Sequence, residues 1–215
     1  MVAGFAQAAP NDTLVGFARA ELQRRGTARA LDLGCGAGRN AIPLARMGWD
    51  VTGIDLSWPM LRAADRRASE TRLQDRVSLA LAAMDRIPAQ DQRFDLVVAH
   101  GIWNLARSAA EFRRALGEAA RVARPGAGLF VFTFSRSTLP AETRPLSGEP
   151  FVFTEFSGQP QCFLTERELF SELRDAGFAP DPAVPLEEHN RPRPGSLHGA
   201  GPVIYEAAFR RVGLG

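Results

Sequence analysis

The chain has 215 residues, of which 45% are hydrophobic and 23% charged, a balance typical of a globular protein with one well-buried core. All 26 basic residues are Arg, which excludes chemistry that needs a Lys amine, such as Schiff-base catalysis or phosphate binding by a P-loop lysine. The formal charge is +2, and the Arg residues are interleaved with 24 acids. Because this distribution gives no concentrated positive field, we expect no nucleic-acid partner.

The positions of the Cys and His residues and the composition of the N-terminus indicate the cellular compartment and whether a metal site is expected. Cys35 and Cys162 lie far apart and make neither a disulfide framework nor a zinc motif, and the three His residues show no metal spacing. Residues 1–10 lack the basic start and apolar run of a signal peptide, and they contain no membrane span. We expect a cytoplasmic protein without a metal or membrane association, either a monomer or a homodimer.

Helices and strands alternate along the first 134 residues. Asn11 and Asp12 are suitable N-caps for an amphipathic helix that stops at Gly26, and almost wholly apolar runs indicate parallel strands covered on both faces. The expected elements that follow are strand 28–33, helix 41–47, strand 51–55, helix 59–71, strand 77–81, strand 94–100, a helix from the Ser108 and Glu111 capping box to Arg124, and strand 129–134. The alternation predicts an α/β fold with a doubly wound, mostly parallel sheet.

The C-terminal third departs from this alternation. Residues 135–163 are rich in Pro, Gly and Phe, as in functional insertions, and Thr165 and Glu168 form a capping box for a helix that ends at Gly177. Residues 184–189 and 203–209 are the last two expected strands, joined by the Pro/Gly-rich loop 190–202. Because this loop is too short for a parallel crossover, we expect the two strands to be antiparallel.

A carboxylate and three glycines end the first expected strand. Asp32 precedes Gly34, Gly36 and Gly38, where the backbone can turn tightly and a ligand can approach a helix N-terminus. The dinucleotide pattern would require its third Gly at position 39, which is Arg. Asp55 ends the next strand, 23 residues after Asp32, where an acid can bind both hydroxyls of a ribose.

The run Ala30-Leu31-Asp32-Leu33-Gly34-Cys35-Gly36-Ala37-Gly38-Arg39-Asn40 resembles motif I of the class I methyltransferases that use S-adenosylmethionine. Segments 83–85, 94–100 and 124–128 also resemble motifs of that family, so the resemblance covers roughly residues 28–134. It implies a Rossmann-like, seven-stranded sheet with helices on both faces and an antiparallel final strand. Within the family, Gly38-Arg39-Asn40-Ala41 is similar to the tellurite- and thiopurine-type enzymes.

The resemblance also implies roles for individual residues, with S-adenosylmethionine as cofactor and S-adenosylhomocysteine as product. The methionine part would be surrounded by Asp32 and the backbone of Gly34, Cys35, Gly36 and Gly38, the ribose by Asp55 and Leu56, the adenine by Met84 and Asp85, and the methyl end by His100. Structural alternatives stay open. Asp55 could cap the helix that follows it, Asp85 could be an ordinary loop acid, and His100 could be a buried structural group. Cys35 is interpreted as a small structural residue of the turn.

Features that are missing narrow the acceptor. After the fourth strand, the segment His100-Gly101-Ile102-Trp103-Asn104 lacks the Asp/Asn-Pro-Pro-aromatic motif of adenine methyltransferases, and no Pro-Cys nucleophile for cytosine is present. We expect a small-molecule acceptor at the carboxyl edge of the sheet. Its predicted contacts are Trp103, Asn104, Arg136 and Phe156, and the 190–202 loop, with His189 and His198 at its borders, is expected nearby. Alternatively, the Phe residues of the insertion only pack it against the sheet.

The sequence therefore predicts methyl transfer by in-line displacement to an O, N, S or metalloid acceptor, accelerated mainly by positioning and desolvation. A general base is required only for a hydroxyl or ammonium acceptor, and His100 is its candidate. The expected organisation is one compact domain with a helical cap (1–27), a cofactor-binding core (28–134), an insertion over the site (135–163) and a C-terminal helix with two strands (164–215). Alternatives are a protein acceptor, a noncatalytic binder of the cofactor, or a nicotinamide oxidoreductase or epimerase. The oxidoreductase is disfavoured because Tyr205 is the only Tyr and no Lys follows it.

Overall fold

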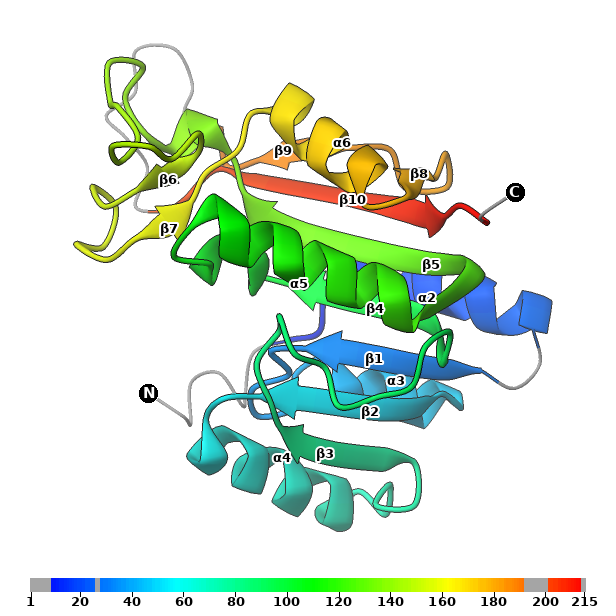
Figure 1. Ribbon diagram of the computed structural model, residues 1–215. Coiled ribbons are helices and arrows are strands. Elements are labelled where there is room, and N and C mark those ends of the chain that lie inside the picture. Colours follow the sequence, from blue (N-terminus) through cyan, green and yellow to red (C-terminus); the bar gives the residue numbers. More distant parts are fainter. Residues whose placement is uncertain (1–8, 26–27, 192–200, 214–215) are drawn as a thin grey trace.

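The computed structural model describes residues 9–25, 28–191 and 201–213, which form one mixed sheet with helices on both sides (Figure 1). Its helices are α2 (Asp12–Arg25), α3 (Ala41–Met47), α4 (Trp58–Glu70), α5 (Ala109–Val122) and α6 (Glu166–Asp175). Its strands are β1 (Arg29–Leu33), β2 (Asp50–Asp55), β3 (Val77–Leu81), β4 (Phe94–His100), β5 (Ala123–Phe134), β6 (Val152–Phe153), β7 (Gln161–Cys162), β8 (Phe178–Pro180), β9 (Glu187–His189) and β10 (Ile204–Arg211). Short 3-10 turns cover Trp103–Leu105 and Arg136–Thr138.

The main sheet has the order β3-β2-β1-β4-β5-β10-β8, with β9 also paired to β10. Strands β1 to β5 are parallel, and β10 runs antiparallel to β5, β8 and β9. The predicted doubly wound α/β fold with antiparallel final strands is confirmed. The sheet has seven positions across, as expected, but the last position is shared by two short strands, β8 and β9, which makes eight strands in total.

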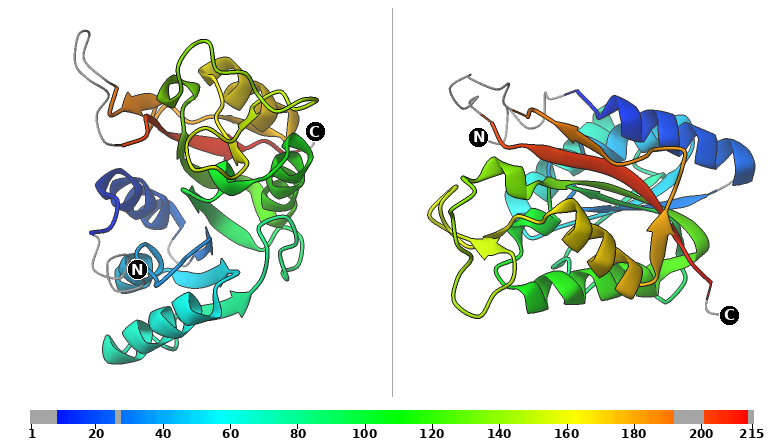
Figure 2. Two further views of the ribbon diagram at one scale, coloured as in Figure 1. Left: turned by 90° about the vertical axis from the view of Figure 1, so that its left-hand side faces the viewer. Right: turned by 90° about the horizontal axis from the view of Figure 1, so that it is seen from above.

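Two apolar layers hold the helices against the sheet. Leu14 and Phe17 of α2 and Ile42 of α3 pack on one face, and Phe112 of α5 and Leu169 of α6 pack on the other. Seen from above, α2 lies on one side of the sheet and α5 and α6 on the opposite side (Figure 2). Because β4 lies in the middle of the sheet and is covered on both faces, it reads as an almost wholly apolar run in the sequence. None of the helices in the described part of the chain is long and apolar enough to cross a bilayer.

Strand β5 begins earlier than predicted. The sequence placed a turn at Pro125 and Gly126 before a strand at 129–134, whereas β5 already starts at Ala123. Its pairing with β4 jumps from Phe94↔Ala123 to Leu96↔Gly128, and Gly126 has a positive φ of 76°. The turn is therefore absorbed as an irregularity inside the strand rather than ending the pairing. The capping box of α6 at Thr165 and Glu168 is confirmed.

The insertion at 135–163 has a buried anchor and a largely exposed remainder, which includes residues 140–142 and 144–148. Phe151, Phe153 and Phe163 are buried. The small hairpin of β6 and β7 lies beyond the N-terminal end of α5 (Figure 1). Phe112 meets Phe151 edge to face, with ring centroids 5.3 Å apart. These three Phe side chains therefore anchor the insertion to the core under α5, as the structural alternative proposed.

Candidate active site

The glycine turn lies between β1 and α3 at the carboxyl edge of the parallel strands. Gly34 has a φ of 65°, and a Cβ there would lie 2.6 Å from Cδ1 of Ile102, so both conformation and space require glycine. Gly36 has a φ of 54°, but a Cβ there would meet nothing within 4 Å. The backbone of Gly36 therefore faces open space, which leaves room for a ligand to approach.

Asp55 links this turn to the next one. Its Oδ2 accepts a hydrogen bond from the amide of Gly36 (2.9 Å), and its Oδ1 accepts one from the amide of Ser57 (2.7 Å). The side chain is only half-buried, and each carboxylate oxygen can accept a further hydrogen bond. Ser57, not Asp55, occupies the N-cap position of α4. Asp55 therefore fixes two turns while it still presents acceptors at the edge of the sheet.

Asp32 and Arg39 stand on either side of the glycine run, and burial shifts the pKa of both. Asp32 is 1% exposed, and its Oδ2 has no hydrogen-bond partner among the described residues. Burial raises the pKa of Asp32 to about 7, although the charge of Arg39 and a hydrogen bond from the amide of Ala41 oppose the shift. The guanidinium of Arg39 is itself partly buried, which lowers its pKa. Sequence reasoning gave Arg39 no role, although it stands directly after the glycine run.

His100 ends β4 next to Arg39. A guanidinium nitrogen of Arg39 lies 2.6 Å from Nδ1 and 2.9 Å from Nε2, and the imidazole stacks on Phe132 with ring centroids 4.1 Å apart. Burial, followed by the charge of Arg39, lowers the pKa of His100 to about 3. His100 lies beside Arg39 of the glycine turn, and its role as a general base stays a prediction, which the lowered pKa does not favour.

A second group of polar side chains continues from His100, and of its further members only His189 was predicted near the acceptor. Asn11 Nδ2 lies 3.5 Å from His100 Nε2 and donates to Oε1 of Glu206 (2.5 Å). The other carboxylate oxygen of Glu206 lies 3.3 Å from Nε2 of His189. Glu206 is 5% exposed and stands among the buried residues 204–209 of β10. That single acid in an apolar run was the sequence signal that could have identified it.

The predicted adenine side lies at the carboxyl ends of β2 and β3. Leu56 is exposed, Met84 is 8% exposed, and Oδ2 of Asp85 lies 3.2 Å from Nε of Arg114 on α5. Leu81, paired with Asp55 across the two strands, is exposed as well. The structure thus places apolar surface directly beside the Asp55 carboxylate, while Asp85 already has one cationic neighbour.

Two of the predicted acceptor contacts lie in the core instead. Trp103 is fully buried and packs edge to face against Phe112 (6.2 Å), and Asn104 is 2% exposed. Arg136 donates to the carbonyls of Leu139, Pro140, Ala141 and Thr143 and covers the ring of Phe153, so its guanidinium serves the insertion. The predictions for these three residues are corrected. Phe156 is 44% exposed and stays a predicted contact.

Cys35 of the turn and the possible metal ligands in the described part of the chain are the residues that bear on covalent and metal chemistry. Cys35 is 5% exposed inside the turn, and burial together with the charges of Asp32 and Asp55 raises the pKa of its thiol. A buried thiol with a raised pKa is a poor nucleophile, which agrees with the interpretation of Cys35 as a structural residue. Within residues 9–25, 28–191 and 201–213 no three His, Cys, Asp or Glu side chains form a group that could hold a metal ion. His198 and most of the predicted 190–202 loop lie outside the described residues.

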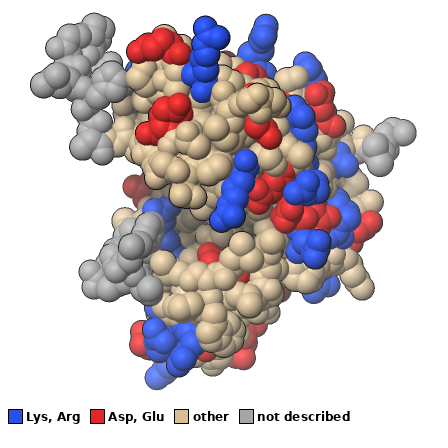
Figure 3. Space-filling view, turned by 60° about the vertical axis from the view of Figure 1, so that its left-hand side comes forward, with Lys and Arg blue, Asp and Glu red and all other residues tan. Residues whose placement is uncertain are grey.

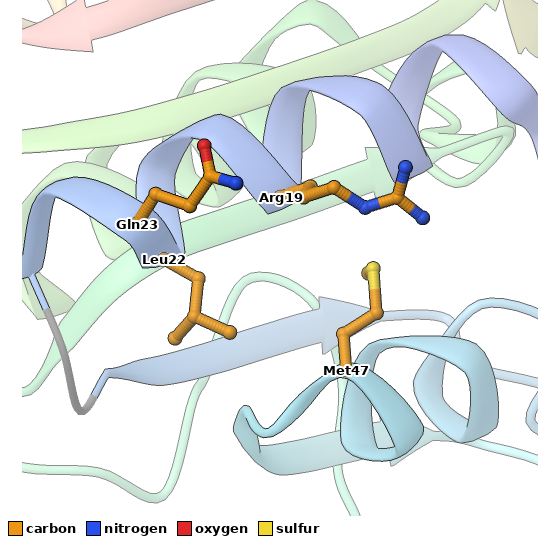
Figure 4. A pocket seen from close by; sticks show the side chains of 4 residues that line it. All are labelled: Arg19, Leu22, Gln23 and Met47. Atoms are coloured by element: carbon orange, nitrogen blue, oxygen red, sulfur yellow. The ribbon is translucent and has the colours of Figure 1, made fainter.

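The carboxyl edge of the sheet is hollowed on the surface. Figure 3 turns this edge forward, and the molecule shows a recess between its upper and lower halves with both basic and acidic atoms at its rim. A different depression lies between α2 and α3 and is lined by Arg19, Leu22 and Gln23 of α2 and Met47 of α3 (Figure 4). None of the predicted site residues lines that second depression.

Comparison with known proteins identifies this arrangement. Residues 30–126 match the family model described as a methyltransferase domain. The chain is 31% identical over 178 residues to a demethylmenaquinone methyltransferase of Lactiplantibacillus plantarum, covering 74% of this chain and 73% of that protein. It is also 31% identical over 172 residues to the 27-O-demethylrifamycin SV methyltransferase of Amycolatopsis mediterranei, covering 76% of this chain and 58% of the relative.

A solved structure agrees at the level of the fold. The S-adenosylmethionine-dependent methyltransferase of Methanosarcina mazei superposes with a TM-score of 0.70 at 24% identity, covering 86% of this chain and 93% of that one. Motif spacing, sheet order and relatives converge on one family. The chain belongs to the class I S-adenosylmethionine-dependent methyltransferases.

Proposed function

We propose that this enzyme transfers the methyl group of S-adenosylmethionine to a small ring compound held at the carboxyl ends of β4 and β5 and the start of β10. The observation that carries the cofactor placement is the Asp55 carboxylate, held by the amides of Gly36 and Ser57 at the edge of the open glycine turn. The relatives named above support a small-molecule acceptor, since their names specify a demethylmenaquinone and a rifamycin. These relatives give no support for the finer tellurite or thiopurine resemblance.

The residues present fit the cofactor. The unpartnered Oδ2 of buried Asp32 and the uncovered backbone of Gly36 would hold the methionine part, while Asp55 would accept from the two ribose hydroxyls. Leu56 and Met84 would lie against the adenine, with Asp85 near its amine. The guanidinium of Arg39 has no carboxylate hydrogen bond among the described residues and would bind the carboxylate of the methionine part.

The bound cofactor supplies a sulfonium methyl group that is already a strong electrophile. The protein's contribution is then to align the acceptor lone pair with the carbon–sulfur bond and to exclude water from that line. His100 stacked on Phe132 forms a neutral wall at the end of β4, and its low pKa keeps a second positive charge away from the sulfonium. A fixed neutral surface of this kind favours transfer without charge repulsion.

Ligand-induced stabilisation tests the cofactor assignment. S-adenosylhomocysteine at a hundredfold over its dissociation constant should add about 2.7 kcal/mol to the free energy of unfolding, which raises the melting temperature by several degrees. NAD at the same concentration should leave the melting temperature unchanged. A shift with NAD alone contradicts the proposal. Turnover with a panel of small molecules, rather than with protein extracts only, separates a small acceptor from a protein acceptor.

A further inference from the structure

Exposed apolar side chains are distributed unevenly over the protein. Seven large hydrophobic residues of the described chain are exposed, and one of them, Val212, follows the last residue of β10 at the amino edge of the parallel strands. The other six lie at or after the carboxyl ends of β2 to β5 and form what we call the apolar rim: Leu56, Trp58, Leu81, Leu105, Leu146 and Phe156. Single exposed apolar residues are common on protein surfaces, but a concentration at one edge indicates an interaction site.

The apolar rim lies on both sides of the recess at the carboxyl edge. The start of α4, the end of β3 and the hairpin of β6 and β7 all lie on the left-hand side of Figure 1. Leu56 and Trp58 belong to the start of α4, whereas Leu146 and Phe156 belong to the insertion on the other side of the recess. Figure 3 turns this side forward and shows uncharged surface above and below the recess. The rim therefore borders the mouth of the candidate active site.

The cofactor and the acceptor account for only part of the rim. Leu56 and Phe156 have predicted roles beside the adenine and the acceptor, but Trp58, Leu105 and Leu146 have none. Trp58 occupies the first position of α4 and is 60% exposed, whereas the other two Trp residues of the chain are fully buried. An exposed Trp loses the apolar burial that usually holds this side chain in a protein. The rim therefore requires a partner of its own.

Exposed arginines accompany the apolar rim. Arg62, Arg107 and Arg144 lie in the same segments, and their guanidinium groups form no ion pair among the described residues. The exposed acids of these segments are Glu142 and Glu155, so the rim has a small excess of positive charge. Arg side chains can place their charge at a negatively charged surface while their aliphatic part lies along apolar groups. This charge favours an anionic partner.

The arrangement of the rim favours a lipid surface over a folded protein or a peptide. Its side chains stand singly on separate loops, and none of them lines the depression between α2 and α3 or the one between Phe151 and α6. A bilayer is deformable and requires no matching groove. Trp is enriched at the level of the lipid headgroups, Leu and Phe insert below them, and Arg binds anionic headgroups. The rim combines all of these residue types.

We infer that the apolar rim docks on the surface of a bilayer that contains anionic phospholipid, with the recess facing the lipid. The docking is peripheral, since no helix in the described part of the chain can span a membrane. It departs from the sequence-based expectation of no membrane association, which rested on the lack of a span and of a signal peptide. A surface assembled from several loops leaves no contiguous signal in the sequence. The inference goes beyond the proposed function, because docking does not depend on the methyl donor.

The test uses the full-length protein and the fluorescence of Trp58. Because Trp49 and Trp103 are fully buried, Trp58 is the fluorophore that a new environment can change. Vesicles of phosphatidylcholine and phosphatidylglycerol in equal parts should shift its emission to shorter wavelength, and brominated lipid in the same vesicles should quench it. Co-sedimentation measures the affinity. Vesicles of phosphatidylcholine alone should bind at least about tenfold more weakly, because each Arg near an anionic surface contributes about 1 kcal/mol.

Substitutions in the rim separate its apolar and its charged contributions. Leu105→Ser and Leu146→Ser should each weaken binding to the mixed vesicles by at least about fivefold. Arg107→Gln should weaken it about fivefold and leave binding to phosphatidylcholine vesicles unchanged. Val212→Ser is the matched control, because it removes an exposed apolar side chain at the opposite edge, and should change the affinity by less than twofold. Melting curves show that each variant is folded.

Three results would overturn the inference. The first is a Trp58 emission that the mixed vesicles leave unchanged, and the second is an equal loss of vesicle binding in Val212→Ser and Leu146→Ser. The third is self-association without vesicles that Leu146→Ser abolishes, which would make the rim a contact between two copies of the chain. Binding of S-adenosylhomocysteine is measured separately on the same protein. Its failure while vesicle binding persists contradicts only the proposed function.

Discussion

Among the described residues, buried acids are paired with Arg at the amino edge of the sheet but not at its carboxyl edge. At the amino edge, Glu21 is paired with Arg24, Arg25 and Arg210, and Asp95 is paired with Arg25 and Arg124. At the carboxyl edge, Asp32 keeps an oxygen without any described partner, and Glu206 accepts a hydrogen bond from the amide of Asn11 without an Arg among its described contacts. The chain has 26 Arg residues, so arginine was available for both edges.

Buried acids that are paired with Arg stabilise the fold, whereas buried acids without an Arg partner are available to a ligand. Paired acids at the amino edge connect α2 to β4 and β10, which lie far apart in the sequence. Acids at the carboxyl edge have unmet hydrogen-bonding capacity, which costs stability in the free protein and becomes useful when a ligand supplies the missing donor. Substitutions at the two edges should therefore have opposite signatures in stability and binding.

The largest expected effect is on stability at the amino edge. Glu21→Ala removes a fully buried carboxylate that faces three Arg residues, and should lower the free energy of unfolding by about 3 kcal/mol. Denaturant unfolding measures this loss. Affinity for S-adenosylhomocysteine should change by less than twofold. Asp175→Ala, which removes an exposed acid 3.8 Å from Arg174, is the control and should cost less than about 0.5 kcal/mol.

Asp55→Ala should give the reverse pattern. Hydrogen bonds to a charged acceptor contribute about 1.5 to 3 kcal/mol each, so loss of the ribose contacts should weaken S-adenosylhomocysteine binding by at least about tenfold. The free protein should lose only about 1 kcal/mol, from the amides of Gly36 and Ser57. Calorimetric titration and melting curves measure the two effects. Asp50→Ala, at the amino end of the same strand, should leave binding intact; equal binding by Asp55→Ala would falsify the ribose placement.

Asp32→Asn should stabilise the free protein while it weakens binding. The pKa of Asp32 is raised from 3.8 to about 7, so the folded state holds the proton more tightly than the unfolded state. Stability from this group therefore falls as pH rises from about 4 to 7, and the penalty is complete at pH 8. At pH 8 the variant should be more stable than the parent by roughly 1 kcal/mol or more, and the gain should vanish near pH 4. A gain that is independent of pH contradicts this account.

Cys35→Ala should have the smallest effect. The thiol is buried, its pKa is raised, and its one described hydrogen bond reaches the carbonyl of Gly36 at 3.8 Å. We expect a loss of about 1 kcal/mol in the free energy of unfolding from the small cavity, and S-adenosylhomocysteine affinity within a factor of two of the parent. A large loss of activity on saturation with both substrates is the outcome that would reveal a covalent role.

The fold could be predicted from the sequence because the helix caps, the glycines and the apolar patterns all indicated the same helices and strands. Helix α3 has the predicted bounds, and Asp55 ends β2 as expected. The short strand β8 was missed, since three residues after a helix carry no periodic pattern. The early start of β5 was missed because Pro125 and Gly126 normally end pairing, and only the neighbouring strand shows that it continues.

The site was only partly accessible. The glycine turn and Asp55 can each be recognised from a short stretch of sequence at the end of a strand. The structure brings the two within hydrogen-bond distance. Trp103 was misplaced because an aromatic residue after a strand is equally compatible with a binding surface and with the core. The row of Asn11, His100, Glu206 and His189 joins residues up to 195 positions apart, so only the antiparallel pairing of β10 could reveal it. Sequence spacing does not encode such long-range contacts.

The central claim is that the unpaired acids at the carboxyl edge are completed by the cofactor. It can be tested directly by titrating S-adenosylhomocysteine into the protein at pH 7 by calorimetry in two buffers of different ionisation enthalpy. An ammonium group bound near Asp32 would lower its pKa, so binding should release a fraction of a proton. Asp32→Asn should abolish that release, and Glu21→Ala should leave it unchanged. Binding without proton release, or an equal release from Asp32→Asn, would contradict the account.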